Sequence, residues 1–149
     1  MRAILQRVSR AEVRSQHEVL GSIQSGFLVL LGVAIGDSEE DAAFIADKAI
    51  GLRVFADAEG KMNLSLKAIG GEMLVVSQFT LLADTEAGRR PSFTRAAPPD
   101  DAHRLYSRFV SIARERGIKV ECGRFGASME VELVNDGPVT IVLDSRIRK

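Results

Sequence analysis

The segment 27–35, Phe-Leu-Val-Leu-Leu-Gly-Val-Ala-Ile, contains no polar or charged side chain. An uninterrupted apolar run that follows a turn, here Ser25-Gly26, is typical of a β-strand buried on both faces. Residues 2–14 alternate apolar and charged side chains, which indicates a strand with one wet face, and residues 19–23 read as its return strand. These patterns predict an opening meander of three strands at the centre of a sheet.

Two later segments carry the signals of helix starts. Asp37-Ser38 and Pro98-Pro99 each precede acidic residues, which are favourable at the positive end of a helix dipole. The faces expected to be buried are Ala42, Ile45, Ala49 and Leu52 in the first helix and Ala102, Leu105, Tyr106, Phe109 and Ala113 in the second, which ends at Gly117.

The remaining sequence predicts further strands. They are expected at residues 53–55, 72–81, 118–121, 129–134 and 139–143, with a turn at 57–60 and an irregular stretch at 61–71. Three strands, a helix, two or three strands, a helix and three strands describe an α+β domain with a mainly antiparallel sheet and two principal helices. A chain of 149 residues is long enough for one such domain, spanning 1–149.

Charge argues against broad binding along a nucleic acid. Twenty basic and twenty acidic residues cancel, so the chain lacks the extended positive field that drives such binding. Any RNA contact is therefore expected to be local. The candidate patches are Arg89, Arg90 and Arg95 in mid-chain and Arg146, Arg148 and Lys149 at the end, and ordinary solvated surface charge explains both equally simply.

Metal chemistry has few candidate ligands. Cys122 is the single cysteine and His17 and His103 are the only histidines, so neither an internal disulfide nor a His/Cys metal cluster is expected. Each of the three also has a structural explanation: Cys122 as a small packing residue at the end of a strand, His17 in a turn, and His103 in the first turns of the second helix. The first residues are charged and contain no apolar run, which predicts neither a signal peptide nor a spanning helix and makes the cytoplasm the expected compartment.

Polar residues interrupt the apolar strand at residues 72–81. Ser77-Gln78-Phe79-Thr80 places two hydroxyls and an amide beside a long Gly-, Arg- and Pro-rich loop, although these residues could simply terminate the strand. A threonine hydroxyl needs a base to act as a nucleophile, and no histidine is near in sequence. The segment can instead offer the Gln78 amide and backbone N–H groups that stabilise an oxyanion.

Asn135-Asp136-Gly137-Pro138 is the second unusual segment. Glycine allows backbone conformations closed to other residues, and a bond before proline can be cis, although a trans turn is the ordinary outcome.

Four ordered segments together resemble the D-aminoacyl-tRNA deacylases, the D-tyrosyl-tRNA deacylase family. They are Met1-Arg2-Ala3 leading into Gln6-Arg7-Val8-Ser9-Arg10-Ala11, Ser77-Gln78-Phe79-Thr80-Leu81, Gly88-Arg89-Arg90-Pro91-Ser92-Phe93, and Asn135-Asp136-Gly137-Pro138-Val139-Thr140, with Lys61-Met62-Asn63 and Phe125-Gly126-Ala127 between them. The match spans nearly the whole chain. The resemblance implies a homodimer, a β-β-α layered sandwich, and an ester hydrolase that removes D-amino acids from tRNA in translation proofreading.

The resemblance also implies residue roles. Ser77, Gln78, Phe79 and Thr80 would form the catalytic pocket, with Phe79 and Thr80 nearest the ester. Gly137 and Pro138 would form a cis peptide inserted from the partner subunit, oriented by Arg7, that leaves no room for an L side chain. Phe125 and Met129 would lie against the terminal adenosine. The implied partners are aminoacyl-tRNA and a second copy of the chain, with no cofactor, metal, membrane or DNA.

A mechanism follows from the absence of a base beside Thr80. Water would attack the ester, backbone amides near Phe79 and Thr80 would stabilise the oxyanion, and the terminal 2′-hydroxyl of the tRNA would assist; glycyl-tRNA should also be cleaved. Two alternatives stay open. A deacylase of the same fold with Gly137-Pro138 trans would accept L substrates, and a nucleic-acid-binding or scaffold protein could keep the fold without turnover.

Overall fold

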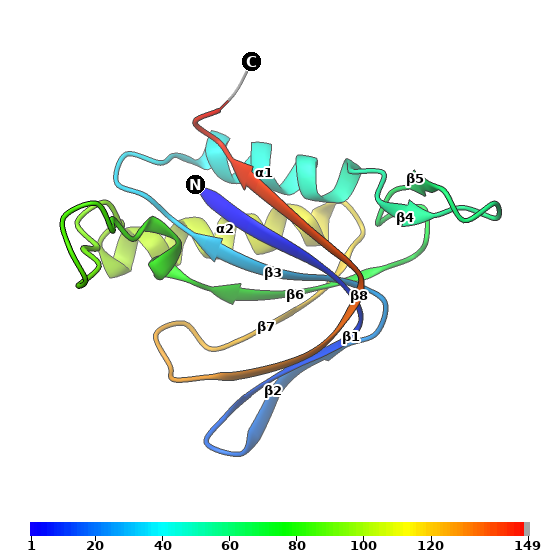
Figure 1. Ribbon diagram of the computed structural model, residues 1–149, viewed down its shortest axis with the longest axis horizontal. Coiled ribbons are helices and arrows are strands. Elements are labelled where there is room, and N and C mark those ends of the chain that lie inside the picture. Colours follow the sequence, from blue (N-terminus) through cyan, green and yellow to red (C-terminus); the bar gives the residue numbers. More distant parts are fainter. Residues whose placement is uncertain (148–149) are drawn as a thin grey trace.

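The computed structural model describes residues 1–147. The fold is built from two principal helices, a short 3-10 helix and eight strands (Figure 1). In chain order the elements are β1 (Arg2–Ser15), β2 (Glu18–Ile23), β3 (Gly26–Gly32), α1 (Glu39–Gly51), β4 (Phe55–Ala56), β5 (Met62–Leu64), β6 (Glu72–Ser77), the 3-10 helix η1 (Phe79–Leu82), α2 (Pro99–Glu115), β7 (Lys119–Cys122) and β8 (Glu130–Asp144).

Strand β1 organises the sheet because it is long enough to pair with three other strands. β8 runs antiparallel along one edge of it, from the Arg2 and Asp144 pair to the Arg14 and Glu130 pair. β2 and β3 share the other edge, where β3 pairs with its first half and β2 with its second half. The strand order is therefore β2-β1-β3-β6-β7, so the predicted three strands are present, but β2 and β3 do not pair as a simple meander would require.

The two parallel pairings, β3 with β6 and β6 with β7, are joined by crossovers that contain α1 and α2. Successive crossovers in one direction place their helices on the same face of the sheet, and Figure 1 shows α1 and α2 together on one side. The other four pairings, those of β1 with β2, β3 and β8 and of β4 with β5, are antiparallel, so the expected α+β class with a mainly antiparallel sheet is confirmed.

Strand β3 is buried on both faces, as its apolar sequence predicts. Phe27, Val29 and Leu31 pack into the core beneath the helices, whereas Leu28 belongs to a second core on the opposite face of the sheet. Because side chains alternate along a strand, an uninterrupted apolar run serves both cores.

The second core forms because the sheet folds over itself. The second half of β1 and the adjoining β2 contribute Val8, Ala11, Val13 and Ile23, which pack with Leu28 and with residues of β6. Figure 1 shows β2 and the neighbouring part of β8 bent away from the helices. The molecule therefore has a helical layer and two sheet layers, the β-β-α arrangement that the resemblance implies.

Both helices begin and bury their faces as predicted. The carboxylate of Asp41 accepts hydrogen bonds from the Ser38 N–H at 2.8 Å and the Ser38 hydroxyl at 3.0 Å, which fixes the first turn of α1. Gly117 follows α2 with a φ of 86°, a conformation that favours glycine. The predicted buried stripes are confirmed except at Leu52, which lies just after α1 and is half-buried.

Several boundaries differ from the sequence expectation, among them the strand expected at 53–55, which is observed as β4 at Phe55–Ala56. The strand expected to reach residue 81 ends at Ser77, and the chain continues as η1. The stretch 61–71 contains β5, which pairs with β4. Residues 129–134 and 139–143 belong to one continuous strand, because both halves of β8 pair with β1, and residues 136–139 leave the ladder as a bulge opposite Arg7.

Among residues 1–147, neither helix combines the length and the apolar character needed to cross a bilayer.

Candidate active site

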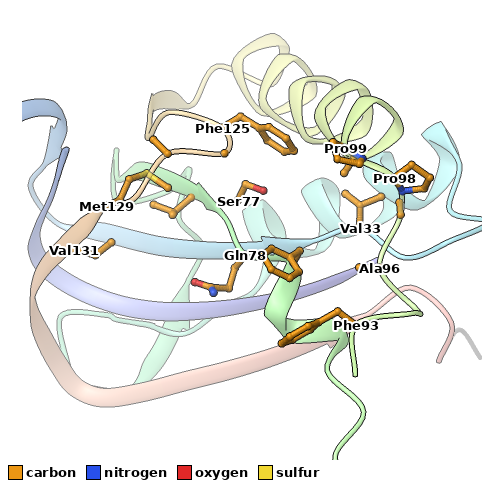
Figure 2. Close-up of a pocket in the computed structure, with 16 residues that line it drawn as sticks. Val33, Ser77, Gln78, Phe93, Ala96, Pro98, Pro99, Phe125, Met129 and Val131 are labelled. Atoms are coloured by element: carbon orange, nitrogen blue, oxygen red, sulfur yellow. The ribbon is translucent and has the colours of Figure 1, made fainter. Parts of the chain in front are cut away.

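A cavity of about 720 Å³ opens at the carboxyl end of β6 (Figure 2). Its size lies within the range of about 300–1,000 Å³ that is usual for small-ligand sites. Its wall is formed by the residue after β3, by the end of β6 with the start of η1, by the segment leading into α2 with the first turn of that helix, and by the loop between β7 and β8 with the start of β8. The lining residues are Val33, Val76, Ser77, Gln78, Phe79, Phe93, Ala96, Ala97, Pro98, Pro99, Ala102, Phe125, Gly126, Ala127, Met129 and Val131.

The polar end of β6 is held against β3 by backbone contacts. The Gln78 N–H donates to the Leu31 carbonyl at 2.8 Å, which extends the parallel ladder by one residue before the chain turns. Beyond it, the Leu81 N–H donates to the Gln78 carbonyl at 3.2 Å and begins η1. Gly32 makes this turn possible because a Cβ there would lie 2.9 Å from the Gln78 carbonyl oxygen and 2.6 Å from Leu82 Cδ2.

The predicted catalytic residues lie together, but not all of them face the cavity. Ser77, Gln78 and Phe79 line it, whereas Thr80 is exposed beside it and hydrogen-bonds through its hydroxyl to the Gln78 side-chain amide. Within residues 1–147, no hydrogen-bond acceptor is present for the N–H groups of Phe79 and Thr80. These N–H groups belong to the first turn of η1, where a helix offers them no acceptor, and they are available to a negatively charged oxygen.

Of residues 1–147, none with an ionisable side chain lines the cavity. His103 packs its ring against Phe125 with centroids 4.8 Å apart, and His17 lies in the turn between β1 and β2 with a φ of 66°. Cys122, at the end of β7, is half-buried and does not reach the lining either. Within residues 1–147, His, Cys, Asp and Glu side chains form no group that could hold a metal ion.

Phe125 and Met129 are among the apolar residues that line the cavity, and the contact with the terminal adenosine that the resemblance implies for them stays a prediction. Phe125 is supported from behind by the rings of His103 and Tyr106. Burial, followed by the neighbouring Cys122 thiol, raises the pKa of Tyr106 well above its ordinary value, and the phenol donates a hydrogen bond to the Val75 carbonyl at 2.8 Å. Tyr106 is therefore a fixed donor that holds the wall in place and not a proton acceptor.

The second predicted group, Gly137, Pro138 and Arg7, lies elsewhere in the chain. The Gly137–Pro138 bond is cis, as the resemblance implies for an enzyme that rejects L substrates, and both residues are exposed. Arg7 Nε donates to the Asp136 carbonyl at 3.0 Å and Arg7 Nη1 to the Val54 carbonyl at 2.6 Å, so this side chain joins the bulge to the segment before β4. None of the three lines the cavity of the same chain. Figure 1 shows the middle of β8 on the side of the molecule away from the arrowhead of β6.

One wall of the cavity was not predicted from sequence. Ala34 and Ala96 form an antiparallel bridge, in which the Ile35 N–H donates to the Arg95 carbonyl at 3.0 Å and the Ala97 N–H to the Val33 carbonyl at 3.0 Å. This bridge brings residues 93–99 to the end of β3. The available signal was the pair Ala96-Ala97 directly before Pro98-Pro99, where the pattern predicted only a helix start.

Of the basic patches, Arg95 pairs with Asp84 at 3.2 Å, and Arg146 donates to the Ile35 carbonyl at 2.7 Å. Arg148 and Lys149, which complete the patch expected at the end of the chain, lie outside the described residues.

Comparisons with known proteins agree with the motifs and the geometry. A family model described as D-Tyr-tRNA(Tyr) deacylase matches residues 4–144. Two proteins named D-aminoacyl-tRNA deacylase, from Dehalococcoides mccartyi and Thermotoga petrophila, are 61% and 59% identical to the chain; the alignments cover 99% and 97% of it and 97% of each relative.

Two solved structures share the fold. One described as c-Myc DNA Unwinding Element Binding Protein superposes with a TM-score of 0.91 at 39% identity, covering 97% of this chain and 98% of the other. A probable eukaryotic D-amino acid tRNA deacylase superposes with a TM-score of 0.80 at 17% identity, covering 95% of this chain and 97% of the other, which shows a shared fold. The chain belongs to the D-Tyr-tRNA(Tyr) deacylase family.

Proposed function

We propose that this protein hydrolyses the ester bond of D-aminoacyl-tRNA, releases the free D-amino acid and tRNA, and so acts in chirality proofreading during translation. The observation that carries the proposal is the cavity at the end of β6, which has no ionisable lining residue and is adjoined by the unpaired N–H groups of Phe79 and Thr80. Such a site suits an ester, a neutral group whose carbonyl oxygen becomes negative only during reaction. The relatives named above support the same activity. The expected compartment is the cytoplasm.

The proposed chemistry needs no side-chain base. The oxygen of a water molecule adds to the ester carbonyl carbon, and the resulting oxyanion is stabilised by the N–H groups of Phe79 and Thr80. The terminal 2′-hydroxyl of the tRNA assists the proton transfer from water towards the leaving oxygen. The bond to the ribose 3′-oxygen then breaks, and this oxygen leaves with a proton. Gln78 keeps the site in shape through its hydrogen bond to Thr80, and no metal or organic cofactor takes part.

The proposed chiral filter comes from a second copy of the chain. Gly137 and Pro138 are exposed and lie away from the cavity of their own chain, so a homodimer is the arrangement in which they can meet substrate. Backbone carbonyls at this position hold the α-amino group, and the closeness of the backbone leaves no space for an L side chain. The contacts of Arg7 with Asp136 and Val54 fix the position of this segment.

Replacing Thr80 with alanine tests the role of the hydroxyl. Because the hydroxyl only positions Gln78, the substitution is expected to lower kcat for D-tyrosyl-tRNA about 10- to 100-fold, and Thr80→Ser should restore most of the rate. The measurement is single-turnover hydrolysis, with circular dichroism to confirm the fold. A loss on the order of 10⁶-fold, the size seen when a nucleophile is removed, would show that the hydroxyl attacks the ester and that substrate assistance is wrong.

Glycyl-tRNA is also expected to be a substrate. Glycine has no side chain, and a filter that works by excluding the L side chain has nothing to exclude. Glycyl-tRNA and D-tyrosyl-tRNA should therefore both be cleared at the same enzyme concentration, while L-tyrosyl-tRNA persists. Survival of glycyl-tRNA at enzyme levels that remove D-tyrosyl-tRNA would mean that the site recognises the D side chain directly.

A further inference from the structure

Two phenylalanines are exposed at the mouth of the cavity. Phe79, the first residue of η1, has 54% of its surface accessible, and Phe93, in the loop 83–98, has 36%. Both line the cavity, and their rings meet edge to face with centroids 5.1 Å apart. Two large aromatic side chains exposed to solvent beside a ligand cavity indicate a surface that binds part of the ligand.

The loop that carries Phe93 is held in one conformation. Asp84 and Ser92 exchange two backbone hydrogen bonds of 2.8 Å, and the Ala96 N–H donates to the Phe93 carbonyl at 3.0 Å. The bridge between Ala34 and Ala96 then ties the loop to the end of β3. These hydrogen bonds fix the backbone around Phe93. A ligand that stacks on the ring therefore loses little binding free energy to ordering of the loop.

The charges on this loop indicate what the ligand is. Arg89 and Arg90 form no ion pair within residues 1–147, and Arg95 is 58% exposed despite its contact with Asp84. Exposed aromatic rings together with arginines on the same loop are a combination that binds single-stranded nucleic acid, because the rings stack on bases and the guanidinium groups attract phosphates.

We propose that Phe79 and Phe93 form a stacking platform for the nucleobase that precedes the terminal adenosine of the tRNA. The proposal rests on the proposed function and on the expectation, implied by the resemblance, that the terminal adenosine lies against Phe125 and Met129. In Figure 2, Phe125 and Met129 lie above Gln78 and Phe93 lies below it, so two separate surfaces flank the polar centre of the cavity. One takes the terminal base and the other takes its neighbour.

The test compares two small substrates with the full-length protein. D-tyrosyl-adenosine carries only the terminal nucleoside, whereas the D-tyrosyl ester of cytidylyl-adenosine adds one nucleotide. Stacking of one base on aromatic residues strengthens binding about fivefold to 100-fold, so kcat/KM is expected to be about tenfold higher for the dinucleotide ester. A dinucleotide whose first residue is abasic should lose this advantage although it keeps the phosphate.

Phe93→Ala is expected to bring the ratio of the two kcat/KM values close to one, whereas Phe93→Tyr should keep it. The control is Val19→Ala, which removes another exposed apolar side chain, 51% accessible, on β2, and should leave the ratio unchanged. The ratio is an internal measure, so a general loss of stability or of active enzyme does not change it.

Four results would overturn the platform. An equal kcat/KM for both substrates in the unmodified protein, or an equal loss for both in Phe93→Ala, would show that Phe93 only shapes the cavity. Dissociation of the oligomer by Phe93→Ala in sedimentation would show that a second copy of the chain covers the pair. If neither ester nor D-tyrosyl-tRNA is hydrolysed, the proposed function fails and the platform fails with it.

Discussion

Replacing Gly137 with alanine is expected to lower kcat/KM for D-tyrosyl-tRNA by about 100-fold or more. Gly137 has a φ of 127°, which L residues rarely adopt, and an added Cβ would lie 2.9 Å from both Arg7 Nη2 and Val139 Cγ2. Arg7 cannot simply move aside, because two carbonyl groups already accept its hydrogen bonds. The segment 136–139 must therefore shift, and a displacement of about 1 Å is enough to disturb a site built on close backbone contact.

The fold should survive this change because the bulge is exposed and outside both cores. A fall of only a few degrees in Tm is expected. The control is Gly51→Ala at the end of α1, where an added Cβ meets nothing within 4 Å, and this variant should keep full activity. If Gly137→Ala also kept full activity, the bulge would not be part of the active site.

Replacing Gly32 with alanine is expected to have an effect of similar size through the cavity itself. Gly32 is the last residue of β3, and a Cβ there would lie 2.9 Å from the Gln78 carbonyl oxygen. Because this oxygen accepts the first hydrogen bond of η1, pushing it away displaces the N–H groups of Phe79 and Thr80. We expect about a 100-fold loss of kcat, with KM changed much less, since the oxyanion forms only in the transition state.

Single-turnover kinetics and thermal unfolding together separate this effect from a loss of fold. Crowding in a packed region costs about 1–3 kcal/mol, so Gly32→Ala should remain folded at assay temperature with a lower Tm. Loss of binding with an unchanged kcat would contradict the assignment of the Phe79 and Thr80 amides.

The parts of the fold that local signals specify could be predicted from sequence. Acidic first turns and 3.6-residue periodicity place both helices, and the uncharged run in β3 reflects burial by a layer on each face. The ends of β6 and β8 could not be predicted in the same way. β6 ends at Ser77 because the chain turns over Gly32, a residue of another strand, and β8 is continuous because its partner is β1, more than 100 residues earlier in the chain.

The candidate site was predictable only where its residues are close in sequence or share a known motif. Ser77, Gln78 and Phe79 line the cavity together, and Phe125 and Met129 line the same cavity. The wall formed by residues 93–99 depends on the bridge between Ala34 and Ala96, a long-range pairing without a local signal. Thr80 was expected to face the cavity but lies beside it, because η1 turns its side chain towards that of Gln78.

The cavity at the end of β6 and the bulge at residues 136–139 lie apart in the chain. In the proposed function, this separation lets the protein distinguish D from L substrates by shape. None of the lining residues within 1–147 has an ionisable side chain that could form an ion pair with the α-amino group. In the proposed function, discrimination comes from a rigid steric element, and the bulge fixed by Arg7 is the candidate for it. Chemistry and chirality would be handled by different segments, and in the proposed dimer by different subunits.

The central claim is that this protein removes D-amino acids from tRNA and rejects their L counterparts. The most direct measurement is hydrolysis of matched D-tyrosyl-tRNA and L-tyrosyl-tRNA by the purified protein in the presence of EDTA. Rapid loss of the D ester alone is the predicted result, and it would establish the activity, the chiral filter and the independence from metal ions. Cleavage of the L ester at a comparable rate, or cleavage of neither ester, would contradict the claim.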